Sequence, residues 1–217
     1  MKVIGVGFGR TGTWSLKHAL DEIGAGPCFH MLDLIRNPDK VGPWHDAAIK
    51  GKPDWDAMFD GFESTIDWPG CSFWEELIEV YPDAKVLLNV RDFDGWLKSF
   101  NNTIYAVRKA AMAGELVQDA NRPAPSPELW EVIGHLVYER DLQGKVDDHE
   151  ALRELYDNRI ETIKAKVPAE RLTVFELGTD GWETLADMMG VEAPTTEFPH
   201  LHDTDEFRSE FGLPALA

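Results

Sequence analysis

A cation and three hydroxyl groups lie in or directly after a glycine-rich turn near the start of the chain. Residues 7–12 read Gly-Phe-Gly-Arg-Thr-Gly and contain Arg10 and Thr11, and Thr13 and Ser15 follow directly. The backbone N–H groups of such a turn, together with the positive end of a following helix, bind anions and most often phosphates. The chemistry that these residues indicate is therefore the binding of a phosphate compound.

The segments on either side of the turn have the patterns needed to position it. The apolar residues 2–7 predict a buried strand, and the apolar side chains at i, i+3, i+4 and i+7 predict a helix over 13–23. These four side chains are Leu16, Ala19, Leu20 and Ile23. A strand, a glycine-rich turn and a helix in this order would direct the N-terminus of the helix at the anion.

Two common phosphate loops fit this turn poorly. Residues 7–12 match G-x-G-x-x-G, but a dinucleotide loop also needs a second strand with an acidic residue about 20 positions on. The sequence offers no convincing strand before Asp33. The ATP or GTP loop needs Lys and then Ser or Thr after its last glycine, whereas Thr13 and Trp14 stand there. Mg²⁺-dependent triphosphate chemistry is therefore poorly supported.

A second cation follows another predicted strand. Residues 84–90 form an apolar run that predicts a buried strand, and Arg91 comes directly after it. A helix is expected over 94–112, which places Ser99 on it, eight residues after Arg91. The planar fork of arginine binds phosphate oxygens bidentately. The alternative is that Arg91 forms an ion pair with Asp92 or Asp94 at the strand end.

Arg10-Thr11-Gly12-Thr13 resembles the loop of sulfotransferases that holds the 5′-phosphosulfate of 3′-phosphoadenosine 5′-phosphosulfate (PAPS), although that family typically has lysine where Arg10 stands. The resemblance implies that Arg10 stabilises the bridging oxygen of the donor and that Arg91 and Ser99 hold its 3′-phosphate. No metal is expected. The residues implied in binding PAPS, or its product PAP, at the loop are Gly9, Arg10, Thr11, Gly12, Thr13, Trp14 and Ser15.

The resemblance covers nearly the whole chain. A predicted strand over 171–176 and a helix over 181–189 are similar to the segment that precedes the C-terminal part of sulfotransferases. The sequence departs from the pattern of the cytosolic enzymes in lacking an Arg-Lys-Gly run near its C-terminus, where Arg208 is a poor substitute. A Pro-rich tail is expected there.

Two residues are candidates for the general base that transfer to an alcohol, phenol or amine requires. His30 is the first choice, because a neutral imidazole accepts a proton near pH 7. Asp67, at the end of a short strand expected over 62–66, is the second. A hydrogen-bonded structural histidine and a helix N-cap are the respective alternatives. His200 and His202 form a pair without further ligands, so we expect no metal site.

The fold class that these patterns predict is α/β, with three layers: a central parallel sheet flanked by helices. All 217 residues are expected to form one domain. Helices are expected over 71–81, 127–141 and 147–166, and a helical region connects the first helix to residue 60. Residues 113–127 are expected to form a loop that could cover a substrate. Ligands would collect at the carboxyl ends of the strands, beside Arg10, Asp67, Arg91 and Glu176.

Composition limits the partners. A net charge of −18 argues against nucleic acids, anionic membranes and polyanionic acceptors. Two cysteines and the absence of a long apolar run favour a reduced, cytoplasmic protein. We therefore expect a PAPS-dependent sulfotransferase with a small-molecule acceptor. A homodimer is one option for its assembly. A phosphotransferase with a degenerate loop, a non-catalytic nucleotide-binding protein and an NAD-binding protein are the alternatives, in that order.

Overall fold

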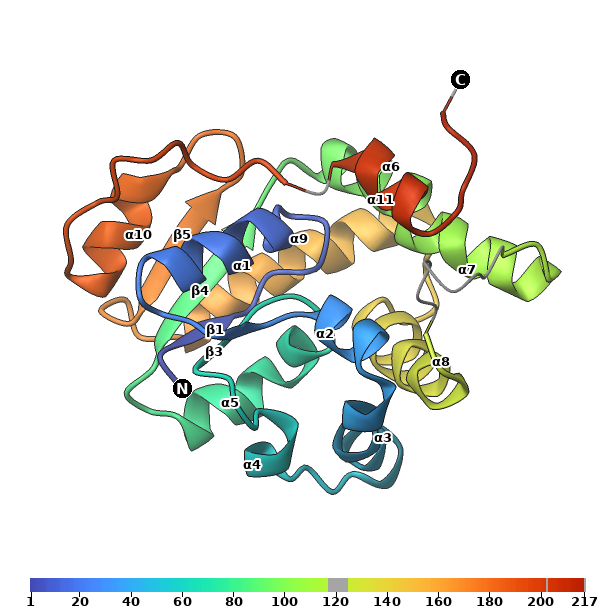
Figure 1. Ribbon diagram of the computed structural model, residues 1–217, viewed down its shortest axis with the longest axis horizontal. Helices are drawn as coiled ribbons and strands as arrows, with labels where there is room; N and C mark the ends of the chain where they lie inside the picture. Colours follow the sequence, from blue (N-terminus) through green and yellow to red (C-terminus); the bar gives the residue numbers. More distant parts are fainter. Residues whose placement is uncertain (117–124, 202, 217) are drawn as a thin grey trace.

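The computed structural model describes residues 1–116, 125–201 and 203–216, and its centre is a sheet of five parallel strands. The strand order is β2-β3-β1-β4-β5, and helices pack on both faces (Figure 1). The strands are β1 (Val3–Gly5), β2 (Cys28–Phe29), β3 (Ser64–Thr65), β4 (Lys85–Val90) and β5 (Leu172–Glu176). The α-helices are α1 (Thr13–Glu22), α2 (Met31–Arg36), α3 (Val41–Lys50), α4 (Trp55–Met58), α5 (Trp74–Val80), α6 (Phe93–Asn102), α7 (Ile104–Ala113), α8 (Pro127–Ile133), α9 (His149–Lys166), α10 (Trp182–Met189) and α11 (Thr204–Glu210). This arrangement confirms the predicted fold class.

The order of the strands reverses direction beside the central strand β1. The chain runs from β1 to β2 and then to β3 on one side, and it crosses to β4 and β5 on the other. Val3 pairs with Ser64 of β3 and with Lys85 of β4. A crevice forms at the carboxyl ends of the strands at such a reversal, and ligands of open α/β sheets bind there. The glycine-rich turn leaves β1 at this point.

Alternate side chains of the strands divide between two hydrophobic clusters, as strand geometry requires. Val3 and Leu87 pack with α1 and α10 on one face of the sheet. Ile4 and Val86 pack on the other face in a cluster that includes α5 and α9. β1 and the middle of β4 are buried on both faces, which explains their nearly continuous apolar sequences.

The expectation that no strand precedes Asp33 was wrong. Cys28 and Phe29 form β2, which pairs in parallel with β3. The strand has two residues and is bounded by Pro27 and His30, so neither its length nor its periodicity marks it in the sequence.

The helix expected over 94–112 is two helices, because the chain bends at Thr103. Thr103 adopts φ −124° and ψ −93°, and its buried hydroxyl donates a hydrogen bond to the carbonyl of Ser99 at 2.5 Å. A threonine hydroxyl that bonds back to the preceding turn competes with the helical ladder. The apolar pattern continues through the bend, which is why periodicity predicted one helix.

Other segments differ in detail from the expectations. The predicted helix over 127–141 is α8 followed by a π-helical segment, η3 (Gly134–Asp141). The predicted helix over 71–81 begins as the 3₁₀ segment η2 (Gly70–Phe73). Of the loop expected over 113–127, residues 117–124 lie outside the described part of the chain. Within the described residues, no helix is long and apolar enough to cross a membrane.

The C-terminal segment is not simply the expected tail, since it contains α11. Asp203 caps this helix by accepting from the backbone N–H of Glu206, and the Glu206 side chain accepts in return from the N–H of Asp203. Asp203 followed three residues later by Glu206 is the sequence pattern of a capping box, and this pattern could have predicted the helix. Phe207 and Phe211 are buried against the main core, so α11 returns to the sheet domain beside α6 (Figure 1).

Asp141 is a buried anchor of the core. It accepts hydrogen bonds from Trp68 Nε1 at 2.8 Å and from Ser72 Oγ at 2.6 Å, and Arg159 lies 3.8 Å away. We expect Asp141→Ala to lower the free energy of unfolding by about 2–4 kcal/mol, because it leaves these buried donors unsatisfied. Urea unfolding measures the effect, with exposed Asp157→Ala as the control, expected within about 0.5 kcal/mol of the wild type. Equal stabilities of the two variants would contradict this role.

Candidate active site

The glycine-rich turn approaches its neighbours so closely that side chains are excluded at two positions. A Cβ atom on Gly7 would lie 2.1 Å from the carbonyl oxygen of Asn89, and one on Gly9 would lie 2.4 Å from Asp67 Oδ1. Gly12 adopts φ +80° as the N-cap of α1 and offers no side-chain cap, and the first turn of α1 contains no acidic residue. The N-terminus of α1 is therefore suited to an external anion.

Asn89 holds the turn in shape from the neighbouring strand. Its Oδ1 accepts from the N–H of Gly7 at 3.3 Å, and its Nδ2 donates to Thr11 Oγ1. The Thr11 hydroxyl donates to the carbonyl of Phe8 at 2.6 Å and is fully buried. Thr11 thus uses its side chain within the fold, which leaves its backbone N–H for a ligand. In the sequence Asn89 is only one polar residue in a buried strand, so no local pattern marks its role.

The structure brings together the three residues that were expected to bind phosphates from different parts of the chain. Arg10 donates from Nε to Ser99 Oγ at 3.1 Å, and Arg91 Nη1 donates to the carbonyl of Arg10 at 3.4 Å. Arg10 has a left-handed backbone with φ 69°, a conformation that costs energy in a residue other than glycine and that collects at functional sites. Burial lowers the pKa of Arg10 to about 10, and the nearby Asp67 acts in the opposite direction.

Arg91 has a buried donor that the described residues leave unsatisfied. Its Nε atom is buried without a hydrogen-bond partner among them. An unpaired buried N–H costs free energy, so such groups in native proteins call for an explanation. A phosphate oxygen beside the guanidinium would satisfy it. Asp94 pairs instead with Arg153, which removes one of the two ion pairs suggested for Arg91.

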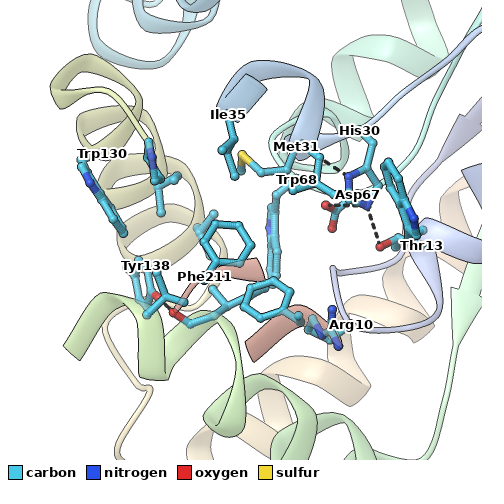
Figure 2. A pocket seen from close by; sticks show the side chains of 18 residues that line it. Arg10, Thr13, His30, Met31, Ile35, Asp67, Trp68, Trp130, Tyr138 and Phe211 are labelled. Carbon is cyan, nitrogen blue, oxygen red and sulfur yellow. Dashed lines mark hydrogen bonds and ion pairs between the residues drawn. The ribbon is translucent and has the colours of Figure 1, made fainter. Parts of the chain in front are cut away.

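His30 and Asp67 form a buried pair at the other side of the turn, as Figure 2 shows. His30 Nε2 lies 3.2 Å from Asp67 Oδ2 and 3.1 Å from Thr13 Oγ1. His30 is also the N-cap of α2, since its Nδ1 accepts from the N–H of Leu32 at 3.2 Å. Asp67 follows β3 with φ 73° and is not a helix cap. Burial raises the pKa of Asp67 to about 7.

The remaining loop residues connect the turn to the C-terminal segment and to α2. Ser15 Oγ accepts from the N–H of Leu201 at 2.9 Å. The Trp14 ring meets His30 edge-on, with ring centroids 5.0 Å apart, and Arg36 lies 5.2 Å above the Trp14 ring. Trp14 therefore forms a wall beside His30. Glu176, expected near the ligand, is exposed at the end of β5.

An apolar pocket begins at this polar group. Figure 2 shows Arg10, Thr13, His30 and Asp67 at one end and apolar side chains from α2, α8, η3 and α11 at the other. The apolar lining residues are Trp14, Met31, Leu32, Ile35, Trp68, Ile104, Val107, Pro125, Trp130, Ile133, Val137, Phe207 and Phe211, and Tyr138 adds a phenol ring. Trp14 and Trp68 line this pocket, whereas Trp44 is a core residue stacked on Phe29.

The described residues contain no cluster of three or more His, Cys, Asp or Glu side chains that could hold a metal ion. Of the histidine pair considered above, His202 lies outside the described residues. The polar group at the pocket consists of Arg10, Thr13, His30 and Asp67.

Comparison with known proteins defines the class. Residues 2–207 match the sulfotransferase domain family, so the chain belongs to that family. It is similar to Ava biosynthesis cluster protein M of Aspergillus versicolor, with 31% identity over 215 residues that cover 94% of this chain and 82% of the relative. The protein is therefore a sulfotransferase-like transferase.

Proposed function

We propose that the protein transfers the sulfuryl group of PAPS directly, in line, to a hydroxyl or amine of a small acceptor. The observation that carries this proposal is the convergence of Arg10, Arg91 and Ser99 beside the uncapped N-terminus of α1, at the mouth of an apolar pocket. The first feature suits a donor with two separate phosphate groups. The second suits an uncharged acceptor.

The residues fit the donor at both of its phosphate positions. The backbone N–H groups of residues 11–15 would bind the 5′-phosphate at the helix N-terminus. Arg91 would hold the 3′-phosphate through its fork, with the unsatisfied Nε as one donor, and Ser99 would assist. Bound there, PAPS supplies the activated sulfuryl group. Arg10 would neutralise the negative charge that develops on the bridging oxygen, and no metal is needed for this.

The pocket indicates the kind of acceptor. Its walls are aliphatic and aromatic away from Arg10, Thr13, His30 and Asp67, and binding sites of this type fix a ligand through few polar groups. A compact molecule with an uncharged, apolar body and one hydroxyl or amine fits these walls. Its reactive group would lie at the polar end.

Calorimetric titration with PAP, with ATP plus Mg²⁺ and with NADH tests the donor class. We expect PAP to bind without a metal and the double variant Arg91→Ala/Ser99→Ala to bind it about 10²-fold more weakly, because charge-assisted hydrogen bonds are lost. Arg153→Ala, which removes an exposed arginine of an ion pair with Asp94, is the matched control and should bind PAP normally. Absence of PAP binding, or equal binding by the double variant, would refute the proposal.

PAP binding without transfer to any of a panel of alcohols, phenols and amines would indicate the non-catalytic alternative. Tight Mg²⁺-dependent binding of ATP would indicate the phosphotransferase. The missing lysine and hydroxyl after Gly12 argue against that result.

A further inference from the structure

We propose that Asp67 is the general base that takes the proton from the acceptor, and that His30 is a positioning residue that donates its Nε2–H to Asp67. This inference rests on the proposed function. The sequence favoured His30 over Asp67 as the general base, and the structure leads us to reverse that preference. It follows from the hydrogen bonds of the two side chains.

The tautomer of His30 is assigned by its role as the cap of α2. Nδ1 accepts a hydrogen bond from the backbone N–H of Leu32 at 3.2 Å, so it carries no proton. The neutral imidazole therefore carries its proton on Nε2. This nitrogen is the one that faces Asp67 Oδ2 at 3.2 Å and the pocket. A nitrogen that already holds a proton cannot accept one from a substrate.

Moving the proton of His30 to the other nitrogen would be costly. The N–H of Leu32 would then meet an Nδ1–H, and the first turn of α2 would lose its side-chain cap. Loss of an N-cap hydrogen bond destabilises the helix, and a buried donor left without an acceptor adds a further penalty. The backbone of His30 is itself fastened, because its N–H donates to Asp33 Oδ2 at 2.9 Å.

Asp67 has the environment of a base. Its carboxylate lines the pocket and accepts from the backbone N–H groups of Met31 and Trp68, from the Thr13 hydroxyl and from His30. These contacts fix its orientation, while burial raises its pKa to about 7, the range in which a general base is most effective near neutral pH. Its backbone has φ 73°, which is consistent with a side chain held in place for function.

Three titratable groups lie on the elements packed around Asp67, and two of them act on its charge. Arg10, on the glycine-rich turn, favours its charged form. His30, between β2 and α2, donates to that form. Cys71, in η2, contributes no charge because burial raises the pKa of its thiol well above the ordinary value. Burial therefore favours the protonated form of Asp67, whereas Arg10 and His30 favour the charged form.

Thr13 provides a way to open Asp67 to the acceptor. A carboxylate accepts about four hydrogen bonds, and the Thr13 hydroxyl is one of the donors that favour the charged form of Asp67. Thr13 lies in the first turn of α1, where the 5′-phosphate is expected. When its hydroxyl donates to that phosphate, one position on Asp67 becomes free for the acceptor hydroxyl. Donor binding would then prepare the base.

The acceptor O–H bond breaks, its proton goes to the Asp67 carboxylate, and its oxygen electron pair forms the new O–S bond. The bond between sulfur and the bridging oxygen breaks, and its electron pair stays on the 5′-phosphate beside Arg10. His30 keeps its proton throughout.

Nitrogen-15 NMR of histidine-labelled protein tests the tautomer without any ligand. His30 is assigned by the signals that disappear in His30→Gln. At pH 8 we expect the shifts of an unprotonated Nδ1 and a protonated Nε2. A proton on Nδ1 would overturn the proposal, because Nε2 would then be free to act as the base.

Kinetics with PAPS and 2-naphthol as the acceptor probe test the roles. Asp67→Asn should lower kcat by about 10²–10⁴-fold and remove the acidic limb of the pH profile, in which activity rises towards pH 7. His30→Gln keeps a donor near Asp67 and should retain kcat within about 10-fold, with the acidic limb present. The reverse pattern, with His30→Gln inactive and the acidic limb intact in Asp67→Asn, would refute the assignment. Calorimetry of the wild type with PAP separates the two proposals: if PAP does not bind, the proposed function fails, while the NMR result still decides the tautomer.

Discussion

Replacing Arg10 with alanine should lower kcat by about 10²–10³-fold with a smaller loss of PAP affinity. The guanidinium donates to Ser99, is attracted by the charge of Asp67, is largely buried, and lies over the Phe207 ring at 4.9 Å from its centroid. In this environment a fixed positive charge stabilises developing negative charge far better than water does. Because the bridging oxygen gains that charge in the transition state, the effect should appear mainly in kcat.

Single-turnover transfer from PAPS to 2-naphthol, together with PAP titration, measures the two effects of Arg10 separately. Arg10→Lys keeps the charge without the fork, so it should recover part of the rate. Arg153→Ala is the control for loss of one arginine and should leave kcat unchanged. A loss of PAP affinity in Arg10→Ala with an unchanged kcat would show that Arg10 binds the donor but does not act on the transition state.

The second large effect concerns stability and follows from the buried carboxylate alone. Because burial raises the pKa of Asp67 from an ordinary value near 3.8 to about 7, the folded state binds this proton more tightly than the unfolded chain. The stability that the group contributes is therefore fully present below about pH 4 and is lost as the pH rises to about 7. Asp67→Asn removes the titration and with it this loss.

Urea unfolding of the wild type and Asp67→Asn from pH 4 to pH 8 tests this linkage. The difference in the free energy of unfolding, variant minus wild type, should rise by a few kcal/mol between pH 4 and pH 7 and then become constant. The amide changes the local hydrogen bonds, so the informative quantity is the change with pH and not the offset. A difference that does not depend on pH would show that Asp67 ionises at an ordinary pH in the folded protein. Greater stability of the variant at neutral pH would also show that the carboxylate is kept at the expense of stability, as functional groups often are.

Local patterns in the sequence were enough to predict the framework of the fold and to single out the residues that meet at the glycine-rich turn. Apolar runs predicted β1, β4 and β5, and glycine spacing predicted the turn, because each of these features depends on neighbours along the chain. Arg10, Arg91 and Ser99 could be associated because two strand ends at one edge of a parallel sheet must lie close together. The family resemblance supplied the eight-residue spacing between Arg91 and Ser99.

The division of roles that we propose for His30 and Asp67 could not be read from the sequence. It depends on which nitrogen of His30 caps α2 and on how β2 and β3 place the two side chains 3.2 Å apart. β2 is too short to leave a periodic signal. The roles of Asn89 and Asp141 also depend on tertiary contacts, because their hydrogen-bond partners lie 69 to 82 positions away in the chain.

The apolar pocket shows the same limit most clearly. Its walls come from α2, α8, η3 and α11, and the apolar residues of each look like ordinary core residues in the sequence. Local sequence specifies which residues are apolar and where helices begin, because those properties act over a few positions. Whether an apolar face is filled by packing or left open as a pocket depends on how distant helices meet, and in this protein the return of α11 to the sheet places Phe207 and Phe211 at the pocket beside Arg10.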